Sequence, residues 1–337
     1  MVSVAVDVMG AERGIREAVK GCIKSALHKD VHVVMVGKES LIKEALSNYS
    51  KRILKKSKFD IVNASEVIEM TDEPFSASRK KKNSSILVAL DLLEKGKVSA
   101  FFSPGNTGAV VVSSVLKLGR IEGVSKPALA TVIPSIYGFR VLLDVGASVE
   151  LSAKDYVVFG IMGKVFVENV LRTYRPKVGL LNIGEEEYKG TEVVRKARVL
   201  MQEKLGESFI GNVEGNDIFL GDVDVIVTDG FTGNIVLKSS EGASKALSKL
   251  MKQEIMSKWY GFILGAFIKI ALRKFRKRTD VSEYGAAALL GVNGSVFVGH
   301  GASNAKSIKS GILYSASISR LNLQEKIQRI IKEFGEI

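Results

Sequence analysis

Small polar residues stand beside glycines at seven places where a short apolar run ends. These places are Asp7 to Gly10, Ser103 to Gly108, Asp144 to Ser148, Asn182 to Glu186, Asn212 to Gly215, Asp229 to Asn234, and His300 to Asn304. Glycine lets backbone N–H groups approach a ligand closely, and the N-termini of helices attract anions. Each place alone is typical of an ordinary turn or helix N-cap. Together they predict a polar crevice that accepts an anion.

The elements that must position these residues are short strands alternating with helices. We expect strands at 2–7, 31–36, 59–63, 98–103, 128–133, 140–144, 177–182, 209–212, 223–228 and 295–299, and helices at 13–27, 40–46, 84–93, 109–118, 153–171, 191–205, 234–251 and 303–318. This alternation is typical of a largely parallel sheet, and ligands bind beyond the carboxyl ends of such strands. No repeat or linker interrupts it, so we predict one doubly wound α/β/α body over residues 1–337.

Standard catalytic and cofactor fingerprints are absent from the sequence. It contains no G-x-G-x-x-G, no P-loop and no G-x-S-x-G nucleophile elbow. The single cysteine and the three histidines have no metal-ligand spacing, so we expect neither a metal nor a resident cofactor. His300 is the only histidine near a proposed site, and an isolated histidine after a strand is more often a packed or capping residue than a catalyst.

The charge of the chain favours an acidic partner. Lys and Arg number 49 against 36 Asp and Glu, which gives a net charge of +13. A basic run, Arg79, Lys80, Lys81 and Lys82, precedes Ser84 and Ser85, either of which can open a helix. Such a run is usually a solvated face, but beside a helix N-terminus it can also reinforce the binding of a phosphate.

Residues 250–278 form an amphipathic helical insertion that departs from the rest of the chain. Its apolar side chains include Trp259, Phe262 and Phe267, and its basic ones include Lys269, Arg273 and Arg276. This pattern fits a helix that lies in an anionic membrane interface. It fits equally well a helical hairpin buried between two subunits. The apolar run from Trp259 to Ile268 is too short to span a bilayer, which needs roughly 20 residues.

The strand-end segments together resemble the bacterial phosphate:acyl-carrier-protein acyltransferases, the PlsX family. The resemblance extends from Val4 to about Ile312 and rests on 105–109, 143–147, 179–184, 210–215, 229–234, 284–294 and 300–306. The chain departs from the family pattern at Ala11 and Glu12, where Gly-Asp is usual. Further departures are Pro104, Ser148 and the alanines of 286–288, and all of them affect the details of substrate fit.

The resemblance implies the transfer of a long-chain acyl group from acyl-carrier protein to inorganic phosphate. The product, an acyl phosphate, would then serve a membrane acyltransferase that acylates glycerol 3-phosphate. The implied fold is Rossmann-like and similar to that of isocitrate and isopropylmalate dehydrogenases, with a protruding helical segment. The implied assembly is a homodimer, in the cytoplasm at the membrane surface.

The chemistry of this reaction makes few demands on side chains. Phosphate is already a nucleophile, and the leaving thiolate has a conjugate-acid pKa of roughly 8–9, so positioning and oxyanion stabilisation dominate. We therefore assign Asn106, Thr107 and Asn234 to phosphate or oxyanion contacts, and Asp229 or His300 to the orientation of a proton. The expected substrate-binding set is Asp7, Gly105, Gly108, Asp144, Asn182, Asn212, Glu214, Thr232, Asn304 and Lys306, with Lys306 supplying charge. The basic run and the basic half of 250–278 are expected to meet the acidic carrier protein.

Two other functions remain open at this point. The same architecture hosts phosphotransacetylases, which use acyl-coenzyme A. The charge alone also fits a non-enzymatic module that binds nucleic acid or membrane. The sequence has no helix-turn-helix, zinc finger or RNA-binding aromatic motif, so we expect no nucleic-acid partner.

Overall fold

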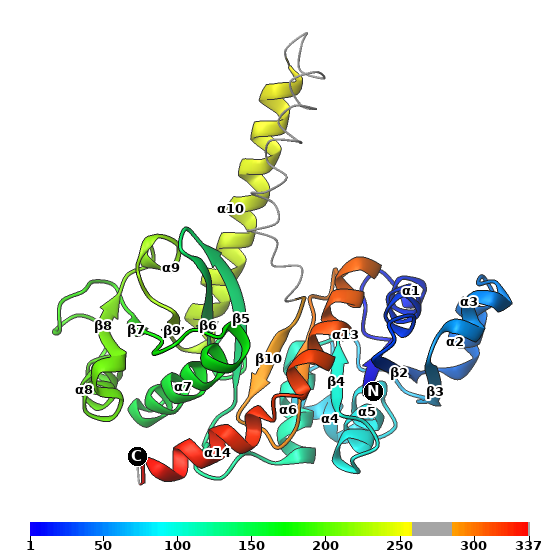
Figure 1. The fold of residues 1–337 in the computed structure, drawn as a ribbon, viewed down its shortest axis with the longest axis horizontal. Coiled ribbons are helices and arrows are strands. Elements are labelled where there is room, and N and C mark those ends of the chain that lie inside the picture. The colour runs from blue at the N-terminus through cyan, green and yellow to red at the C-terminus, as the bar shows by residue number, and fades with distance from the viewer. Residues whose placement is uncertain (258–284, 336–337) are drawn as a thin grey trace.

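The computed structural model describes residues 1–257 and 285–335, and its strands form one mixed sheet (Figure 1). The strands are β1 (Val2–Asp7), β2 (Val31–Gly37), β3 (Phe59–Asn63), β4 (Ala100–Ser103), β5 (Ala128–Ser135), β6 (Gly138–Leu143), β7 (Val178–Leu181), β8 (Phe209–Val213), β9 (Val225–Val227), β10 (Ala287–Leu290) and β11 (Val296–Val298). Their order across the sheet is β3-β2-β1-β4-β11-β10-β5-β6-β9-β7-β8. The expectation of a mostly parallel α/β sheet is confirmed.

The two parallel halves of this sheet run in opposite directions. Strands β1 to β4 and β11 are mutually parallel, β10 is antiparallel to both β11 and β5, and β5 is antiparallel to β6. Strands β6, β9, β7 and β8 are again parallel to one another. The carboxyl ends of the first half therefore lie at one edge of the sheet, which we call the first edge. Those of the second half lie at the opposite edge, so the seven strand ends do not meet directly in one crevice.

Helices cover both faces of the sheet. They are α1 (Ile15–Ala26), α2 (Glu39–Leu46), α3 (Lys51–Lys56), α4 (Pro74–Lys80), α5 (Ser85–Glu94), α6 (Thr107–Leu118), α7 (Ala153–Phe166), α8 (Glu192–Leu205), α9 (Asp217–Leu220), α10 (Gly230–Met256), α13 (Ala305–Ser319) and α14 (Leu323–Glu333). A π-helical turn, η1 (Val167–Leu171), continues α7, and a 3-10 turn, η2 (Gly206–Ser208), follows α8.

The core is divided by the sheet because successive strand residues point to opposite faces. Val4 and Val6 face the apolar layer under α1, α7, α8, α13 and α14. Ala5 faces the layer under α4, α5, α6 and α9. All three are fully buried, so β1 is covered on both sides, as the near-continuous apolar runs of the sequence predict.

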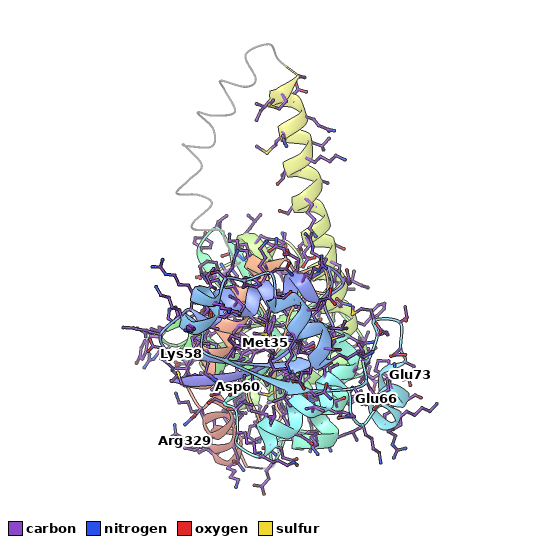
Figure 2. All side chains as sticks on the ribbon, turned by 90° about the vertical axis from the view of Figure 1, so that its right-hand side faces the viewer. Met35, Lys58, Asp60, Glu66, Glu73 and Arg329 are labelled. Carbon is purple, nitrogen blue, oxygen red and sulfur yellow. The ribbon has the colours of Figure 1, made fainter. Side chains whose placement is uncertain are left out.

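Helix α10 leaves the body of the molecule and projects beyond it (Figures 1 and 2). Its first turn is packed, with Gly230 and Gly233 buried, whereas nearly every residue from Gly242 to Met256 is exposed. The projection of α10 begins before residue 250, and the predicted amphipathic segment 250–278 lies mostly outside the described residues. Trp259, Phe262, Phe267, Lys269, Arg273 and Arg276 lie outside the described residues.

Candidate active site

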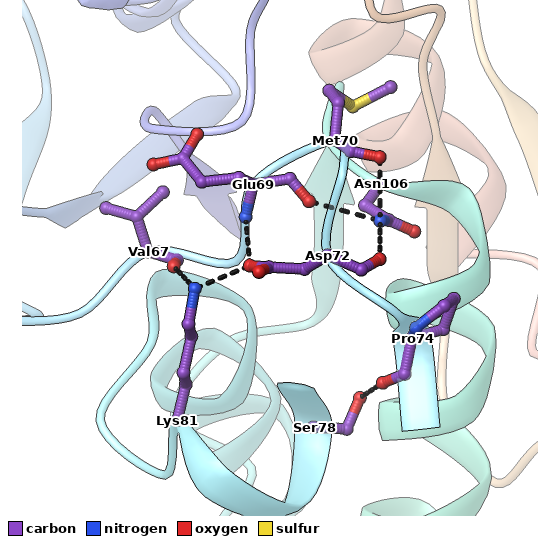
Figure 3. A network of polar contacts seen from close by, with 8 residues as sticks. All are labelled: Val67, Glu69, Met70, Asp72, Pro74, Ser78, Lys81 and Asn106. Carbon is purple, nitrogen blue, oxygen red and sulfur yellow. Dashed lines mark hydrogen bonds and ion pairs between the residues drawn. The ribbon is translucent and has the colours of Figure 1, made fainter. Parts of the chain in front are cut away.

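Asn106 holds a loop of the first half against the start of α6 (Figure 3). Its side-chain oxygen caps α6 by accepting a hydrogen bond of 3.0 Å from the backbone N–H of Ala109. Its side-chain nitrogen donates to the carbonyl oxygens of Glu69, Met70 and Asp72 at 3.1, 3.3 and 3.1 Å. Asn106 is buried. Both ends of the amide are engaged by the protein, so Asn106 positions this loop and the start of α6; its expected oxyanion contact stays a prediction.

The first turn of α6 leaves donors open beside Asn106. Thr107 and Gly108 are half-buried, and the hydroxyl of Thr107 bonds to no described residue. The first backbone N–H groups of a helix have no intrahelical partner. A Cβ on Gly108 would lie 2.6 Å from Cγ of Pro74, so glycine is required for α4 to approach α6. Because the cap is a neutral amide, the positive end of the helix dipole stays available to an anion.

Asp7 lies beneath this turn as a support. It is buried and accepts hydrogen bonds from the hydroxyl of Ser103 at 2.8 Å and from the backbone N–H groups of Met9 and Gly10 at 3.0 and 3.2 Å. The hydroxyl of Ser103 in turn accepts from the N–H of Gly105 at 3.0 Å. Burial raises the pKa of Asp7 above its ordinary value. Asp7 and Gly105 thus take part in a tie between the ends of β1 and β4, and their predicted substrate contacts stay predictions.

His300 stands at the same edge, next to β4. Its Nδ1 accepts a hydrogen bond of 3.1 Å from the backbone N–H of Ala302, which places the proton of a neutral ring on Nε2. That Nε2 lies 3.7 Å from a carboxylate oxygen of Glu241, halfway along α10. His300 is half exposed, so its Nε2 can reach solvent or a ligand.

The N-terminus of α13 already has protein partners. Asn304 accepts hydrogen bonds from the N–H groups of Lys306 and Ser307 at 2.9 and 3.0 Å. Glu17 accepts from the N–H of Ala305 at 2.8 Å. Asn304 therefore caps α13, and its predicted substrate contact stays a prediction. The exposed side chain of Lys306 lies near the first edge.

Asp144 organises the opposite edge of the sheet. It is fully buried, and its carboxylate accepts hydrogen bonds from the backbone N–H groups of Leu129, Gly146, Ala147 and Ser148 at 2.6 to 3.1 Å. Burial raises the pKa of Asp144 to about 6, although the four N–H groups act in the opposite direction. Asp144 thus shapes the loop after β6 and is itself hidden from a substrate.

This raised pKa predicts a pH-dependent stability. The folded protein holds the proton of Asp144 more tightly than the unfolded chain, whose ordinary value is 3.8. The stabilisation is complete below about pH 4 and is lost as the pH rises through 6. Relative to an Asp144→Asn variant, the unfolding free energy should fall by up to about 1.4 kcal/mol per pH unit between about pH 4 and 6 and level off above that. Urea titrations of both proteins between pH 4.5 and 7 measure it, and a constant difference would contradict it.

The start of α10 packs tightly on the Asp144 loop. Asp229 caps the helix by accepting from the N–H and the hydroxyl of Thr232, both at 2.8 Å. The N–H of Gly230 donates to the carbonyl oxygen of Ser148 at 2.8 Å. A Cβ on Gly233 would lie 1.9 Å from the carbonyl oxygen of Asp144. The side chains of Asp229 and Thr232 are therefore occupied with each other in this structure, and the expected roles of Asp229 in orienting a proton and of Thr232 in binding substrate stay predictions.

Asn234 differs from these neighbours because its amide is open. It is exposed and bonds to no described residue, and it lies over Gly146, whose φ of +131° favours glycine. Residues seven apart lie on nearly the same face of a helix, so Asn234 shares a face with Glu241. Glu241 meets His300, so this face of α10 turns toward the first edge. Asn234 thus lies on the same face of α10 as Glu241, which contacts the first edge about 10 Å further along the helix axis.

Asn182 and Asn212 hold a third loop. The side-chain nitrogen of Asn182 donates to the carbonyl of Lys189 at 3.2 Å, and that of Asn212 to the carbonyl of Glu186 at 2.9 Å. Asn212 also lines an open pocket of about 380 Å³, together with Arg198 and three acidic residues, Glu185, Asp217 and Asp222. Three carboxylates against one guanidinium disfavour an anion there. The backbone N–H of Glu214 donates to the carboxylate of Asp217, and the predicted substrate contacts of Asn182, Asn212 and Glu214 stay predictions.

The basic run is only partly available to a partner. Lys81 forms an ion pair with Asp72 at 2.5 Å and donates to the carbonyl of Val67 at 2.8 Å (Figure 3). Lys81 therefore belongs to the loop tied by Asn106. Arg79, Lys80 and Lys82 are exposed, and Ser84 caps α5 as the sequence predicts.

Within residues 1–257 and 285–335, no group of three or more acidic, cysteine or histidine side chains could hold a metal ion. No helix in the same ranges is both long and apolar enough to cross a bilayer.

Comparison with known proteins decides the family. The family model described as "Fatty acid synthesis protein" matches residues 2–326. This chain belongs to that family. This fatty acid synthesis protein is 41% identical over 327 residues to a phosphate acyltransferase of Dictyoglomus turgidum, covering 97% of this chain and 96% of the relative. It is 42% identical over 331 residues to a phosphate acyltransferase of Pelotomaculum thermopropionicum, covering 98% and 95%. It is therefore an acyltransferase, which excludes the non-enzymatic binding module.

Solved structures share the fold of this acyltransferase. A phosphotransacetylase from Streptococcus pyogenes superposes with a TM-score of 0.59 at 13% identity, covering 95% of this chain and 94% of that one. The EutD phosphotransacetylase from Staphylococcus aureus gives 0.58 at 15% identity, covering 94% of both. At such identities the likeness concerns the fold alone.

Three side chains that shape the site were missed by sequence reasoning. Ser103 bridges two loops, Glu17 caps α13 from another helix, and Glu241 meets His300 across the site. Each of these side chains contacts a residue that is distant in sequence, so no local sequence pattern predicts the contact. Glu241 had a sequence signal, because it stands seven residues after Asn234 on a helix that we expected, and Ser103 begins one of the seven strand-end segments.

Proposed function

We propose that this acyltransferase moves a long-chain acyl group from the thioester of acyl-carrier protein to inorganic phosphate. A phosphate oxygen attacks the thioester carbonyl carbon, the carbon–sulfur bond breaks, and the carrier leaves as a thiolate that takes up a proton from water. The products are an acyl phosphate and the free carrier thiol. The relatives named phosphate acyltransferases support phosphate as the acceptor.

The observation that carries the proposal is the open N-terminal turn of α6. It combines a neutral cap, the hydroxyl of Thr107 and unpaired backbone N–H groups, which is the chemistry of a phosphate site. Lys306, near the same edge, can add positive charge. Because phosphate is its own nucleophile, the turn has only to hold it in place.

Asn234 supplies a donor for the other reactant. Its exposed amide lies on the face of α10 that turns toward His300, so it can donate to the thioester oxygen as negative charge develops there. His300 presents the Nε2 proton at the same edge and can hydrogen-bond to phosphate or to the leaving thiolate. The second half of the sheet thus contributes to the proposed site through Asn234 of α10.

Incubation with palmitoyl-carrier protein and radiolabelled phosphate tests the reaction. We expect labelled palmitoyl phosphate and the release of one free carrier thiol for each molecule formed. A parallel incubation with palmitoyl-coenzyme A tests the alternative of a phosphotransacetylase-like donor. Formation of labelled product only from the coenzyme A thioester would overturn acyl-carrier protein as the acyl donor. The absence of labelled product with both donors would overturn phosphate as the acyl acceptor.

The remaining expectations concern assembly and surroundings. We propose that the protein acts as a homodimer at an anionic membrane surface, where a glycerol-3-phosphate acyltransferase uses its product. The segment that motivates this, 250–278, lies mostly outside the described residues. A single domain over 1–337 and a specific likeness to isocitrate and isopropylmalate dehydrogenases remain proposals of the same kind.

A further inference from the structure

One face of α10 carries a column of four lysines. Lys238, Lys245, Lys249 and Lys252 follow one another at intervals of seven, four and three residues, so they share a face of the helix. All four are exposed. Asn234 stands four residues before Lys238 and belongs to the same face. We call these four residues the lysine column.

Contacts of Glu241 fix the direction of this face. Its carboxylate lies 3.7 Å from Nζ of Lys238, 3.7 Å from Nζ of Lys245 and 3.7 Å from Nε2 of His300. The lysine column therefore begins at the proposed site and continues along the part of α10 that projects from the body (Figure 1). Glu241 offsets only one of its four positive charges.

From this arrangement we infer that the lysine column is the docking surface for the acidic acyl-carrier protein, an inference that rests on the proposed function. The column is strongly basic and the carrier is acidic, so the two surfaces attract at long range. The lysines from 238 to 252 extend over about 21 Å of helix axis, which is comparable to one side of a small domain. A partner seated there would present its thioester at the foot of the column, where Asn234 and His300 stand.

The alignment with Asn234 favours a carrier protein over a lipid surface. Lipid headgroups would attract lysines on any exposed face of α10. Binding to lipid would therefore not require the lysines to lie on the same face as Asn234. The opposite face of α10 carries Leu247, Leu250 and Met251, all half exposed or more, so charged and apolar side chains are sorted to different sides. The lysine side is suited to a charged, water-covered partner.

Charge reversal with a matched control tests the inference. The test variant carries Lys245→Glu, Lys249→Glu and Lys252→Glu, which leaves Lys238 beside the site unchanged. The control carries Lys51→Glu, Lys55→Glu and Lys56→Glu on α3, which precedes the edge strand β3, so its total charge is the same. Each protein is assayed for acyl phosphate formation with acyl-carrier protein and with octanoyl-pantetheine, a donor that lacks the carrier.

We expect the KM of the test variant for acyl-carrier protein to rise about tenfold or more at low salt, with little change in kcat. The effect should shrink as salt is raised, and KM for octanoyl-pantetheine should stay that of the parent. The α3 control should resemble the parent with both donors. Glu241→Gln, which removes the acidic side chain of this face, should lower KM for the carrier.

Three results would overturn the docking surface. One is an unchanged KM for the carrier in the test variant. Another is an equal rise in the α3 control, which would show that only the total charge matters. The third is weaker binding of the test variant to phosphatidylglycerol vesicles with no loss of binding to acyl-carrier protein in a direct binding assay, which would assign the column to lipid. If the parent itself made no acyl phosphate from either donor, the proposed function would fail rather than the docking surface.

Discussion

Replacing Gly233 by alanine is expected to abolish acyl transfer and to destabilise the second half of the sheet. The added Cβ would stand 1.9 Å from the carbonyl oxygen of Asp144 and 2.9 Å from Cγ2 of Thr228. A backbone carbonyl cannot rotate away as a flexible side chain can, so α10 must shift from the loop that Asp144 shapes. Overpacking of this kind costs about 1–3 kcal/mol or more. Thermal unfolding and acyl phosphate formation measure the two effects.

Gly242→Ala is the matched control because it makes the same change in the same helix. A Cβ there would meet nothing within 4 Å. Alanine favours a helix over glycine by about 1 kcal/mol, so this variant should be as stable as the parent or more stable, with full activity. If Gly233→Ala behaved in the same way, the close contact between α10 and the Asp144 loop would be wrong.

Asn106→Ala should lower both stability and activity by a large amount. The variant loses the cap of α6 and leaves three carbonyl oxygens, those of Glu69, Met70 and Asp72, without their donor. Loss of a cap costs about 1 kcal/mol, and the hydrogen bonds to the three carbonyls contribute about 1–3 kcal/mol together, so we expect a loss of about 2–4 kcal/mol. Displacement of the α6 turn should also lower kcat/KM for phosphate about 100-fold.

Two comparisons separate the cap from the loop. Asn106→Asp keeps an oxygen for the N–H of Ala109 but sets a carboxylate against the three carbonyls, so it should be no better than alanine. Asn304→Ala removes an N-cap from α13 that has no such carbonyl ties, so it should cost only about 1 kcal/mol. Urea unfolding of the three variants measures this. Equal losses in Asn106→Ala and Asn304→Ala would show that the loop tie contributes nothing.

Much of the fold could be predicted from the sequence because apolar periodicity is a local signal. The first three strands and α8 begin and end within a residue or so of their predicted limits. Strand β10 was missed, since Ala287 to Leu290 has little β-branched character and its strand form depends on pairing with both β11 and β5. That strand, with the reversal between β5 and β6, decides which strand ends share an edge. The expected single crevice failed at this point.

The sequence predicts which polar residues stand at the strand ends better than it predicts what their side chains contact. Asn106, Asp229 and Asn304 stand at helix N-termini, which is the ordinary role of such residues beside glycine, whereas we assign them from the sequence to substrate binding or catalysis. Whether such a side chain caps the helix or faces a ligand depends on what lies across from it. Asn106 and Asn234 look alike in sequence, yet the first meets three carbonyls and the second meets solvent. Only tertiary structure distinguishes them.

The projection of α10 from the body also restricts how this chain can change its length. Each residue inserted between Asn234 and Lys245 would rotate everything beyond it by about 100° about the helix axis. One added residue would turn the lysines to a different side of the helix. Seven added residues would return them to the original side and move them about 10 Å along the helix axis. Insertions and deletions in this stretch should therefore be tolerated only when their length is close to a whole number of helical turns. Exposure of the helix alone would not impose this restriction.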